Sequence, residues 1–436
     1  MHTRKLRDAV HGDIHLTDAE VALLDTPQMQ RLRGIRQLGA TYYVYPSAHH
    51  TRFEHCLGAC WMAKAILERA EADGGLDLPP VERQAICLAA LVHDVTHIPF
   101  GHTFEDERRL LPRHDRSPAR FDMLLGDTEL GERMRASEAG RLALEVLRPG
   151  GELPPERRYV RDVVSGTICA DLLDYLKRDN YFCGLSYEFD ERLFHYFRVE
   201  DGRLVLDLHR GGLLRRDALT EITNLLRIRY VLSERVYYHH AKIAAGVMVS
   251  KAVERALRAG LTERELCTLT DGSLVHSLPQ RFPDDPALCA LVDRFRNRAL
   301  FKRCYMASRR IGEEAVEEAV RCYHLNEDGA RDETERHIAE ELGARPHQVA
   351  LYCAPSGMAL KEADVPVTMP DGRMEPLSSL NTEEIRVLQN QHKQLWRLYT
   401  FISPDAPGQE SAGKVCEHVI GHPNELPAER SLDSEF

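Results

Sequence analysis

The stretch AICLAALVHDVTHIPFGHTFED, residues 85–106, carries the strongest information about the fold. Its first eight residues are apolar and follow a Pro-Pro pair, which predicts a buried helix. The helix runs into His93 and Asp94, and such a pair is costly to bury unless something neutralises it. A cation would do so, and His97 and His102 follow closely. The alternative is that His93 is a satisfied core histidine at a helix end.

Two further motifs contribute the same residue types. RFEH places His55 on a predicted helix, and ADLLDYLKRD places Asp171 on another. Two imidazoles and two carboxylates suit a divalent metal such as Mn²⁺, Fe²⁺, Co²⁺ or Mg²⁺, whereas structural zinc favours thiolates. The set would leave open positions for water and a phosphate oxygen, as metal-assisted phosphoester hydrolysis requires. Asp174, three residues after Asp171, would share its helix face and is the alternative ligand.

The spacing of apolar residues is mostly helical. It predicts long helices over residues 162–178 and 236–257, among others. Strand patterns are sparse, and residues 348–352 with 365–374 are expected to form a small sheet around a Pro-Asp-Gly turn. We therefore expect a mostly α fold: a helical bundle with additional helices and a small β element in the C-terminal half.

The length of 436 residues is compatible with one large helical body. We expect a catalytic core over residues 1–260 and a C-terminal helical lobe with the small sheet, packed on the core, over 261–403. Residues 404–436 are polar and rich in Pro, Gly and Glu, which predicts a disordered tail.

Composition limits the class of protein. The 57 Lys and Arg against 68 Asp and Glu give a net charge of −11, which argues against a nucleic-acid binder or nuclease with a basic stripe. No apolar run approaches the about 18 residues of a membrane helix, and no secretory signal is visible. The 11 Cys show no regular spacing, which fits reduced thiols in the cytoplasm. The surplus of 21 His is the feature that needs an explanation.

Together, the motifs AVHGDIHL, RFEHCLG, HDVTHIPFGHTFED and DLLDYLKRD resemble the HD superfamily of metal-dependent phosphohydrolases. The similarity is to its deoxynucleoside-triphosphate triphosphohydrolase branch, which includes the catalytic domains of sterile-alpha-motif/HD proteins and bacterial relatives. It is densest over residues 9–185 and fades after about residue 260. The resemblance implies an HD-domain helical bundle and cleavage of dNTPs to deoxynucleoside and triphosphate.

The resemblance also implies a role for each matching residue. The implied metal ligands are His55, His93, Asp94 and Asp171. The implied catalytic residues are His102 as general acid, Glu105 as its partner, and His97 and His114 on the phosphates. The implied substrate-binding residues are Arg52 on the triphosphate, Tyr175 and Asp179 on the deoxyribose, Gln37 and Leu38 on sugar and base, and Arg229, Tyr237 and His239 elsewhere in the pocket.

One position departs from the pattern. A relative has a phosphate-binding Lys directly after the Asp ligand, where this chain has Leu172, and Lys177, Arg178 or Arg235 are the candidates to compensate. The departure leaves open whether the substrate is a tri-, di- or monophosphate, or a modified nucleotide. A cyclic-dinucleotide phosphodiesterase is disfavoured because no GYP motif follows the HD region.

The resemblance further implies assembly and regulation. The family assembles as homo-oligomers, so a dimer or tetramer is expected, and an N-terminal site binds an activating guanine nucleotide. Asp25, Gln30 and Arg33 occupy the corresponding positions. The alternative is that Asp25 caps a helix N-terminus while Gln30 and Arg33 brace the fold.

Overall fold

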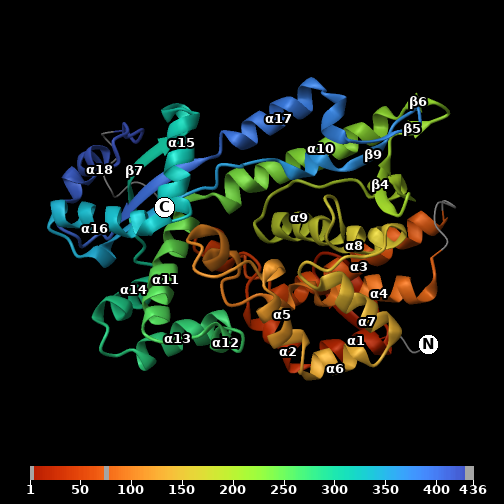
Figure 1. Cartoon of the computed structure of the whole chain (residues 1–436), viewed down its shortest axis with the longest axis horizontal. Helices are drawn as coiled ribbons and strands as arrows, with labels where there is room; N and C mark the ends of the chain where they lie inside the picture. Colours follow the sequence, from red (N-terminus) through yellow and green to blue (C-terminus); the bar gives the residue numbers. More distant parts are fainter. Residues whose placement is uncertain (1–3, 73–77, 428–436) are drawn as a thin grey trace.

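The computed structural model describes residues 4–72 and 78–427, and the fold is predominantly helical (Figure 1). None of the described helices is long and apolar enough to cross a bilayer. The helices are α1 (Asp18–Leu24), α2 (Pro27–Arg31), α3 (Arg52–Ala72), α4 (Pro80–Val92), α5 (Pro118–Leu125), α6 (Glu129–Arg135), α7 (Glu138–Leu147), α8 (Arg158–Ser165), α9 (Ala170–Phe182), α10 (Arg216–Leu232), α11 (His240–Arg258), α12 (Glu263–Leu266), α13 (Asp271–Arg281), α14 (Pro286–Arg296), α15 (Glu313–Ala319), α16 (Ala330–Leu342), α17 (Glu383–Lys393) and α18 (Ala412–Ile420).

The strands form small sheets, and the sheet of β7, β11 and β8 contributes buried side chains to a hydrophobic core. β11 lies between β7 and β8 in an antiparallel three-stranded sheet, and a second sheet has the order β10-β9-β4-β3, in which β9 runs parallel to β4. Two hairpins, β1-β2 and β5-β6, complete the set. The strands are β1 (Arg4–Asp8), β2 (Gly12–Leu16), β3 (Phe197–Glu200), β4 (Arg203–Asp207), β5 (His209–Arg210), β6 (Leu213–Leu214), β7 (Lys302–Ser308), β8 (Val349–Cys353), β9 (Pro366–Thr368), β10 (Met374–Pro376) and β11 (Arg397–Ile402).

The helical bundle is centred on α3, which packs against both α4 and α9. α4 begins with Pro80 and is buried along nearly its whole length, as its apolar sequence predicts. The close approach of α3 and α9 depends on Gly58, because a Cβ there would collide with the carboxylate of Asp174. These three helices therefore bring the predicted ligand motifs into one place.

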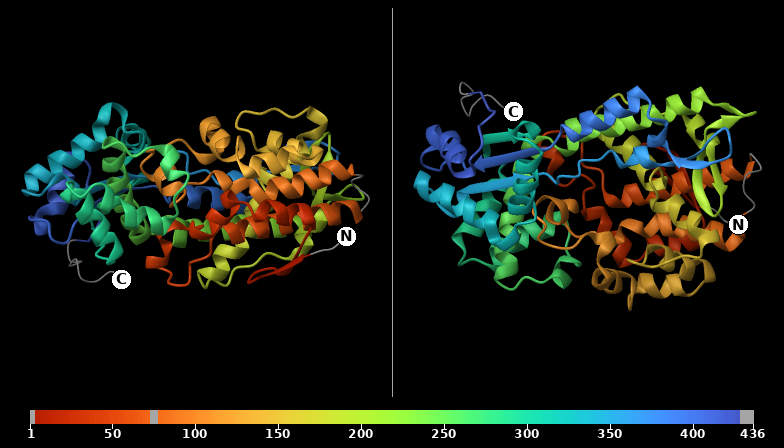
Figure 2. Two further views of the ribbon diagram at one scale, coloured as in Figure 1. Left: turned by 90° about the horizontal axis from the view of Figure 1, so that it is seen from below. Right: turned by 45° about the horizontal axis from the view of Figure 1, so that its top comes forward.

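The molecule has two hydrophobic cores, one in each of two lobes that lie side by side in Figure 2. The first core is built by residues 14–236 and 360–388, and the second by residues 243–416 together with a few side chains from the first half. The expected boundary at residue 260 differs from this arrangement, since α11 belongs to the second core. Residues 360–388 return to the first lobe, where β9 pairs with β4 and α17 packs on α10 (Figure 1).

Three expectations need correction. The helix expected over 162–178 is two helices, α8 and α9, because Gly166 ends α8. The sheet expected from 348–352 and 365–374 is split, since β8 joins β11 whereas β9 and β10 join the other lobe. Disorder from residue 404 is wrong for α18, which packs on α16 and β7 and buries Cys416. The last part of that predicted tail, residues 428–436, lies outside the described residues.

Candidate metal centre

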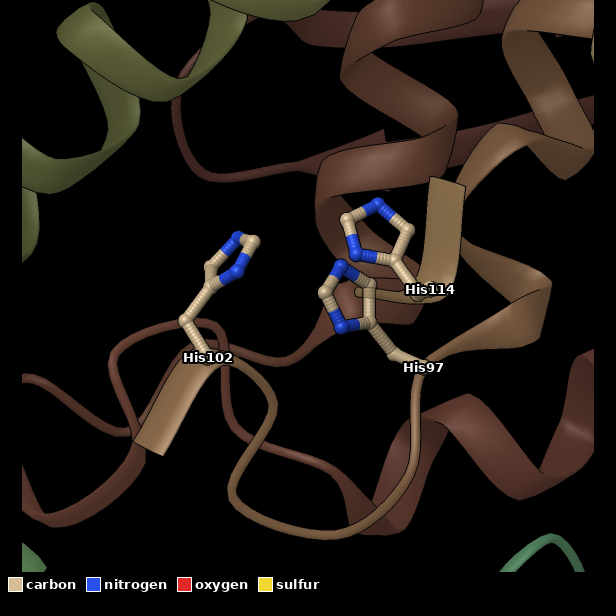
Figure 3. Close-up of side chains that lie close together, drawn as sticks. All are labelled: His97, His102 and His114. Carbon is tan, nitrogen blue, oxygen red and sulfur yellow. The ribbon is translucent and has the colours of Figure 1, made fainter. Parts of the chain in front are cut away.

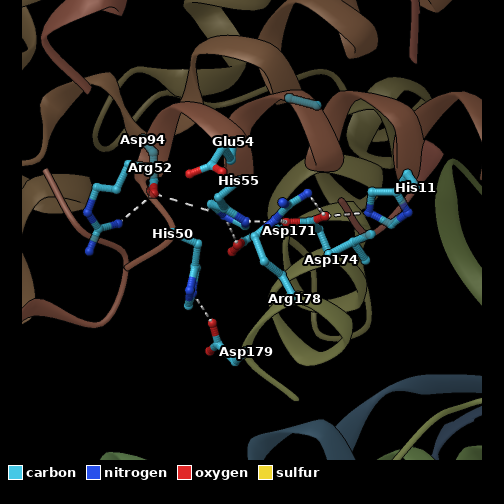
Figure 4. A network of polar contacts seen from close by, with 12 residues as sticks. His11, His50, Arg52, Glu54, His55, Asp94, Asp171, Asp174, Arg178 and Asp179 are labelled. Carbon is cyan, nitrogen blue, oxygen red and sulfur yellow. Dashed lines mark hydrogen bonds and ion pairs between the residues drawn. The ribbon is translucent and has the colours of Figure 1, made fainter. Parts of the chain in front are cut away.

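The four predicted ligands converge from three helices. His55 lies in the first turn of α3, His93 and Asp94 follow the end of α4, and Asp171 lies in the first turn of α9 (Figure 4). His55 Nε2 lies 3.2 Å from His93 Nε2 and 3.0 Å from Asp171 Oδ1. Asp94 Oδ1 is 3.5 Å from His93 Nε2. The side chain of Asp171 is 33% exposed, so solvent reaches the cluster from this side.

The hydrogen bonds made by the Nδ1 atoms of His55 and His93 determine which ring nitrogens face the centre of the cluster. Nδ1 of His93 lies 2.8 Å from the carbonyl of Ala90, and Nδ1 of His55 lies 2.7 Å from Asp174 Oδ2. Both Nδ1 atoms therefore donate hydrogen bonds, and both Nε2 atoms face the carboxylates of Asp94 and Asp171, where a bound cation would replace any Nε2 proton and take the lone pair. Electron-pair donors facing one another fit a divalent cation, which is the chemistry expected of this donor set.

The same geometry raises the basicity of His55. Burial opposes its charged form, but hydrogen bonds to Asp171 and Asp174 outweigh burial and raise the pKa of His55 to about 10. Burial alone would raise the pKa of Asp94, yet Arg52 and the neighbouring histidines hold it well below its usual range. The carboxylates are therefore ionised and available to a cation.

Asp174 lies on the opposite side of His55 from Asp171. It is fully buried, and it contacts His55, Arg178 and His11, whose Nε2 is 2.6 Å away. This carboxylate orients His55 and does not face His93, which distinguishes it from Asp171. His11, in the turn between β1 and β2, was not singled out from the sequence. Its position in the AVHGDIHL motif was the available signal.

Arg52 stands beside the cluster. Its Nη1 donates to Asp94 Oδ2 at 2.5 Å, and its Nε is buried without a hydrogen-bond partner. Gly101 follows Phe100 in the left-handed region, with φ values of 50° and 59°. A Cβ at Gly101 would collide with the guanidinium of Arg52, so the FGH turn requires glycine there.

A second histidine cluster lies next to Asp94. His97 and His114 stack with ring centroids 3.5 Å apart, and His102 faces both rings (Figure 3). His97 Nε2 is 3.2 Å from Asp94 Oδ1. Burial, followed by the charge of Arg52, lowers the pKa of His97 well below its ordinary value, so this ring is neutral.

Carboxylates hold the outer sides of this second cluster. Glu105 Oε2 lies 3.3 Å from His102 Nδ1 and 3.1 Å from His114 Nδ1, while Asp106 Oδ2 lies 3.1 Å from His102 Nδ1. Desolvation opposes the charge on His102, but Asp106 and Glu105 prevail and raise its pKa to about 9. Arg120, which the sequence reasoning missed, donates to Glu105 Oε1 at 2.5 Å and fixes that carboxylate.

The predicted sugar-binding residues form a buried group of their own. Asp179 is 2% exposed and accepts from Tyr237 at 2.7 Å, and His50 Nε2 lies 2.8 Å from its other oxygen. Neither Asp174 nor Asp179 faces solvent. The guanidinium of Arg229 lies 5.7 Å from the ring centre of Tyr175 and 5.0 Å from that of Tyr237.

The positions of the remaining predicted pocket residues do not by themselves indicate contact with a substrate. Gln37 has a buried Oε1 without a hydrogen-bond partner, whereas Leu38 packs against the first core. His239 caps α11, with its Nδ1 accepting from the backbone of Ala241. Leu172 is 4% exposed and belongs to the first core.

Arg178 does not compensate for the missing lysine. It donates to Asp174 and to Asp8 at 2.8 Å, and its side chain is fully buried. The cation is thus committed to holding the carboxylate behind His55.

The candidate activator residues take part in local contacts. Gln30 donates to the carbonyl of Leu24 and accepts from Arg33, whose guanidinium stacks on Phe53. Asp25 is exposed and ends α1, so it does not cap a helix N-terminus. These contacts fit the bracing alternative for Gln30 and Arg33.

Comparisons with known proteins agree with the geometry. The HD domain model matches residues 52–179, and the HD associated region model matches residues 190–423. The chain is 31% identical over 255 residues to the uncharacterized protein YwfO of Bacillus subtilis (strain 168), covering 57% of this chain and 55% of that protein. It is 27% identical over 314 residues to the deoxynucleoside triphosphate triphosphohydrolase SAMHD1 homolog of Dictyostelium discoideum, covering 68% of this chain and 59% of that protein.

A solved structure is similar over nearly the whole fold. The crystal structure of a hypothetical protein from Aquifex aeolicus superposes with a TM-score of 0.72 at 24% identity, covering 95% of this chain and all of that one. By contrast, the matches span little more than half of the curated relatives' own length. The HD associated region covers more than half of this chain, and the HD domain before it contains the convergent histidines and aspartates. This chain therefore belongs to the HD superfamily of metal-dependent phosphohydrolases.

Proposed function

We propose that the protein hydrolyses 2′-deoxynucleoside 5′-triphosphates to the deoxynucleoside and inorganic triphosphate. The observation that carries the proposal is the convergence of four lone-pair donors, His55, His93, Asp94 and Asp171, beside a second cluster suited to holding protons. The printed names of relatives support the substrate class. A bound divalent cation would neutralise phosphate oxygens and supply a water of lowered pKa.

The cationic side chains nearest the centre would bind the phosphates. Arg52 already directs its guanidinium to Asp94, and its unpartnered Nε is a donor available to a phosphate oxygen. His97 and His114 would contact further phosphate oxygens. These donors stabilise charge that develops on the phosphate in the transition state. The overall charge of −11 does not oppose this, because the attraction is local.

His102 would donate the proton that the departing nucleoside oxygen needs. Glu105 and Asp106 hold its Nδ1 side and keep the ring protonated at neutral pH, with a pKa raised to about 9. The Nε2 proton is then the one available for transfer. Because Glu105 is fixed by Arg120, the ring has a defined orientation.

The substrate's sugar and base would lie against the remaining residues. Tyr175 and Asp179 are proposed to hold the deoxyribose and exclude a 2′-hydroxyl. The other proposed contacts are Gln37, Leu38, Arg229, Tyr237 and His239. Asp179 supports this role because its two oxygens are held by His50 and Tyr237.

The burial of Leu172 favours one second candidate, an HD phosphohydrolase for a di- or monophosphate or a modified nucleotide. Leu172 brings no cation to the phosphates and Arg178 is committed elsewhere, which leaves Lys177 and Arg235 as the candidates to compensate. A shorter phosphate chain needs fewer cations. We also infer a homo-oligomer, which sizing in solution with and without GTP would test together with nucleotide activation.

The test is a chromatographic screen of nucleotides with Mn²⁺. We expect deoxynucleoside and triphosphate from at least one dNTP, and no turnover by His93→Ala–Asp94→Ala. The matched control replaces the surface pair His337 and Glu341, which lie 3.3 Å apart on α16, with alanine and should retain activity. Release of pyrophosphate and a monophosphate would correct the reaction. No turnover of any nucleotide by metal-loaded protein would refute the proposal.

A further inference from the structure

His97, His102 and His114 have a property that phosphate contacts alone do not require. His97 Nδ1 has no hydrogen-bond partner although the side chain is fully buried, while Nε2 lies 3.2 Å from Asp94 Oδ1. A buried ring nitrogen without a partner is costly. A ligand that accepts its lone pair would remove that cost.

The other two rings are oriented towards the same point. Their Nδ1 atoms face Glu105 and Asp106, so their Nε2 atoms are the ones left for a further partner. One nitrogen from each of the three histidines lies within 4.8 Å of the other two (Figure 3). Carboxylates behind metal-binding histidines orient the ring and raise its basicity. Two imidazoles supported in this way, together with His97, would form a tridentate donor set with an open fourth position.

We propose that His97, His102 and His114 form a second cation site, distinct from the centre of His55, His93, Asp94 and Asp171. Three imidazole ligands select borderline ions such as Zn²⁺ and Co²⁺ over Mg²⁺, which prefers oxygen ligands. The two sites share no ligand. Glu105 and Asp106 compensate the charge of the ion.

The second site would inhibit the proposed reaction, and this consequence alone rests on the proposed function. When the ion binds His102, the ring releases its proton to solvent and its Nε2 lone pair goes to the metal. No proton then remains for the departing nucleoside oxygen. Excess Zn²⁺ would therefore inhibit an enzyme already loaded at the first centre, whereas excess Mg²⁺ would not.

The site itself is tested by metal binding without substrate, so its failure and that of the proposed function are distinguishable. The metal-free chain of residues 1–436 is titrated with Co²⁺, and binding is followed by visible absorption and by equilibrium dialysis. We expect two equivalents per chain in the wild type. His114→Gln should lose the Co²⁺ bound at the second site and keep the Co²⁺ bound at the first centre. Asp171→Asn should lose the Co²⁺ at the first centre and keep the one at the second site.

A second pair of variants tests the carboxylates behind the rings. Asp106 is partly exposed, so Asp106→Asn is expected to fold, and it should weaken the second equivalent about 10- to 100-fold. Asp115 also pairs with Arg113, and Asp115→Asn is the matched control that should leave both equivalents unchanged. A single Co²⁺ equivalent in the wild type would overturn the proposal. If a second Co²⁺ still binds to both the His114→Gln and the Asp106→Asn variants, the second cation site does not lie at these histidines.

Discussion

The two histidine clusters use carboxylates on opposite sides of their rings. Around His55 and His93, the carboxylates of Asp94 and Asp171 stand in front, where the Nε2 lone pairs point. Around His102 and His114, the carboxylates of Glu105 and Asp106 stand behind, against Nδ1. The side on which the acid stands therefore decides the role of the ring. An acid in front can itself serve as a ligand beside the ring, whereas an acid behind raises the basicity of the ring.

The largest expected effect comes from replacing Asp171, one of the two carboxylates that face the Nε2 atoms of His55 and His93. Asp171→Asn removes a ligand charge from the first centre, and we expect turnover to fall by more than about 100-fold, because loss of a mere supporting partner already costs about 10- to 100-fold. Metal content by elemental analysis and turnover measured at saturating Mn²⁺ would check this. Full activity at one bound metal per chain would show that Asp171 is not a ligand.

Glu105 and Asp106, the carboxylates that contact Nδ1 of His102, predict that the activity depends on pH. The pKa of His102 is raised to about 9, so the ring is protonated below that value and loses its proton above it. Activity that needs this proton should fall as pH rises through about 9. His102→Gln should lower kcat by about 10²- to 10⁴-fold and remove that limb of the profile. An unchanged alkaline limb in the variant would exclude His102 as the acid.

Replacing Asp174 should have an intermediate effect on metal binding, because its carboxylate contacts Nδ1 of His55 on the side away from the first centre. Asp174→Asn should weaken metal binding about 10- to 100-fold without removing a ligand. Because Asp174 also pairs with buried Arg178, thermal unfolding must first show that the variant is folded. A folded variant with unchanged metal affinity would mean that the orientation of His55 does not depend on this carboxylate.

The smallest expected effect lies away from both clusters. Tyr175→Ala should reduce discrimination against ribonucleotides by about tenfold, equivalent to about 1.4 kcal/mol. The measurement is the ratio of kcat/KM for a dNTP and its ribonucleotide. A ratio equal to that of the wild type would leave Tyr175 as a packing residue under Arg229.

Sequence patterns identified the four residues that the structure brings together, because each belongs to a short motif on a helix or directly after one. The patterns could not reveal which of the two carboxylates contacts which nitrogen of His55. Asp171 and Asp174 lie one turn apart on α9, and a small rotation of this helix would exchange their positions relative to His55. Partners distant in sequence were also missed. His11 reaches Asp174 across 163 residues, and Arg120 links Glu105 to Glu263 of α12. Such pairings depend on how helices pack, which local periodicity does not contain.

The boundaries between lobes were harder to predict for the same reason. A contiguous division at residue 260 assumes that neighbours in sequence share a core, whereas β9 and α17 rejoin the first lobe after the chain has built the second. α18 is a short helix within a polar stretch of sequence, and its apolar residues pack against β7 and α16.

The pairing of β9 with β4 has a consequence for the evolution and dissection of the chain. A fragment ending near residue 260 would lack β9 and α17, leaving β4 as an open sheet edge and uncovering the apolar side chains of α10. Unprotected edges recruit other chains. The motifs of residues 52–179 are therefore expected to be less stable in a fragment that lacks residues 360–388 than in the whole chain.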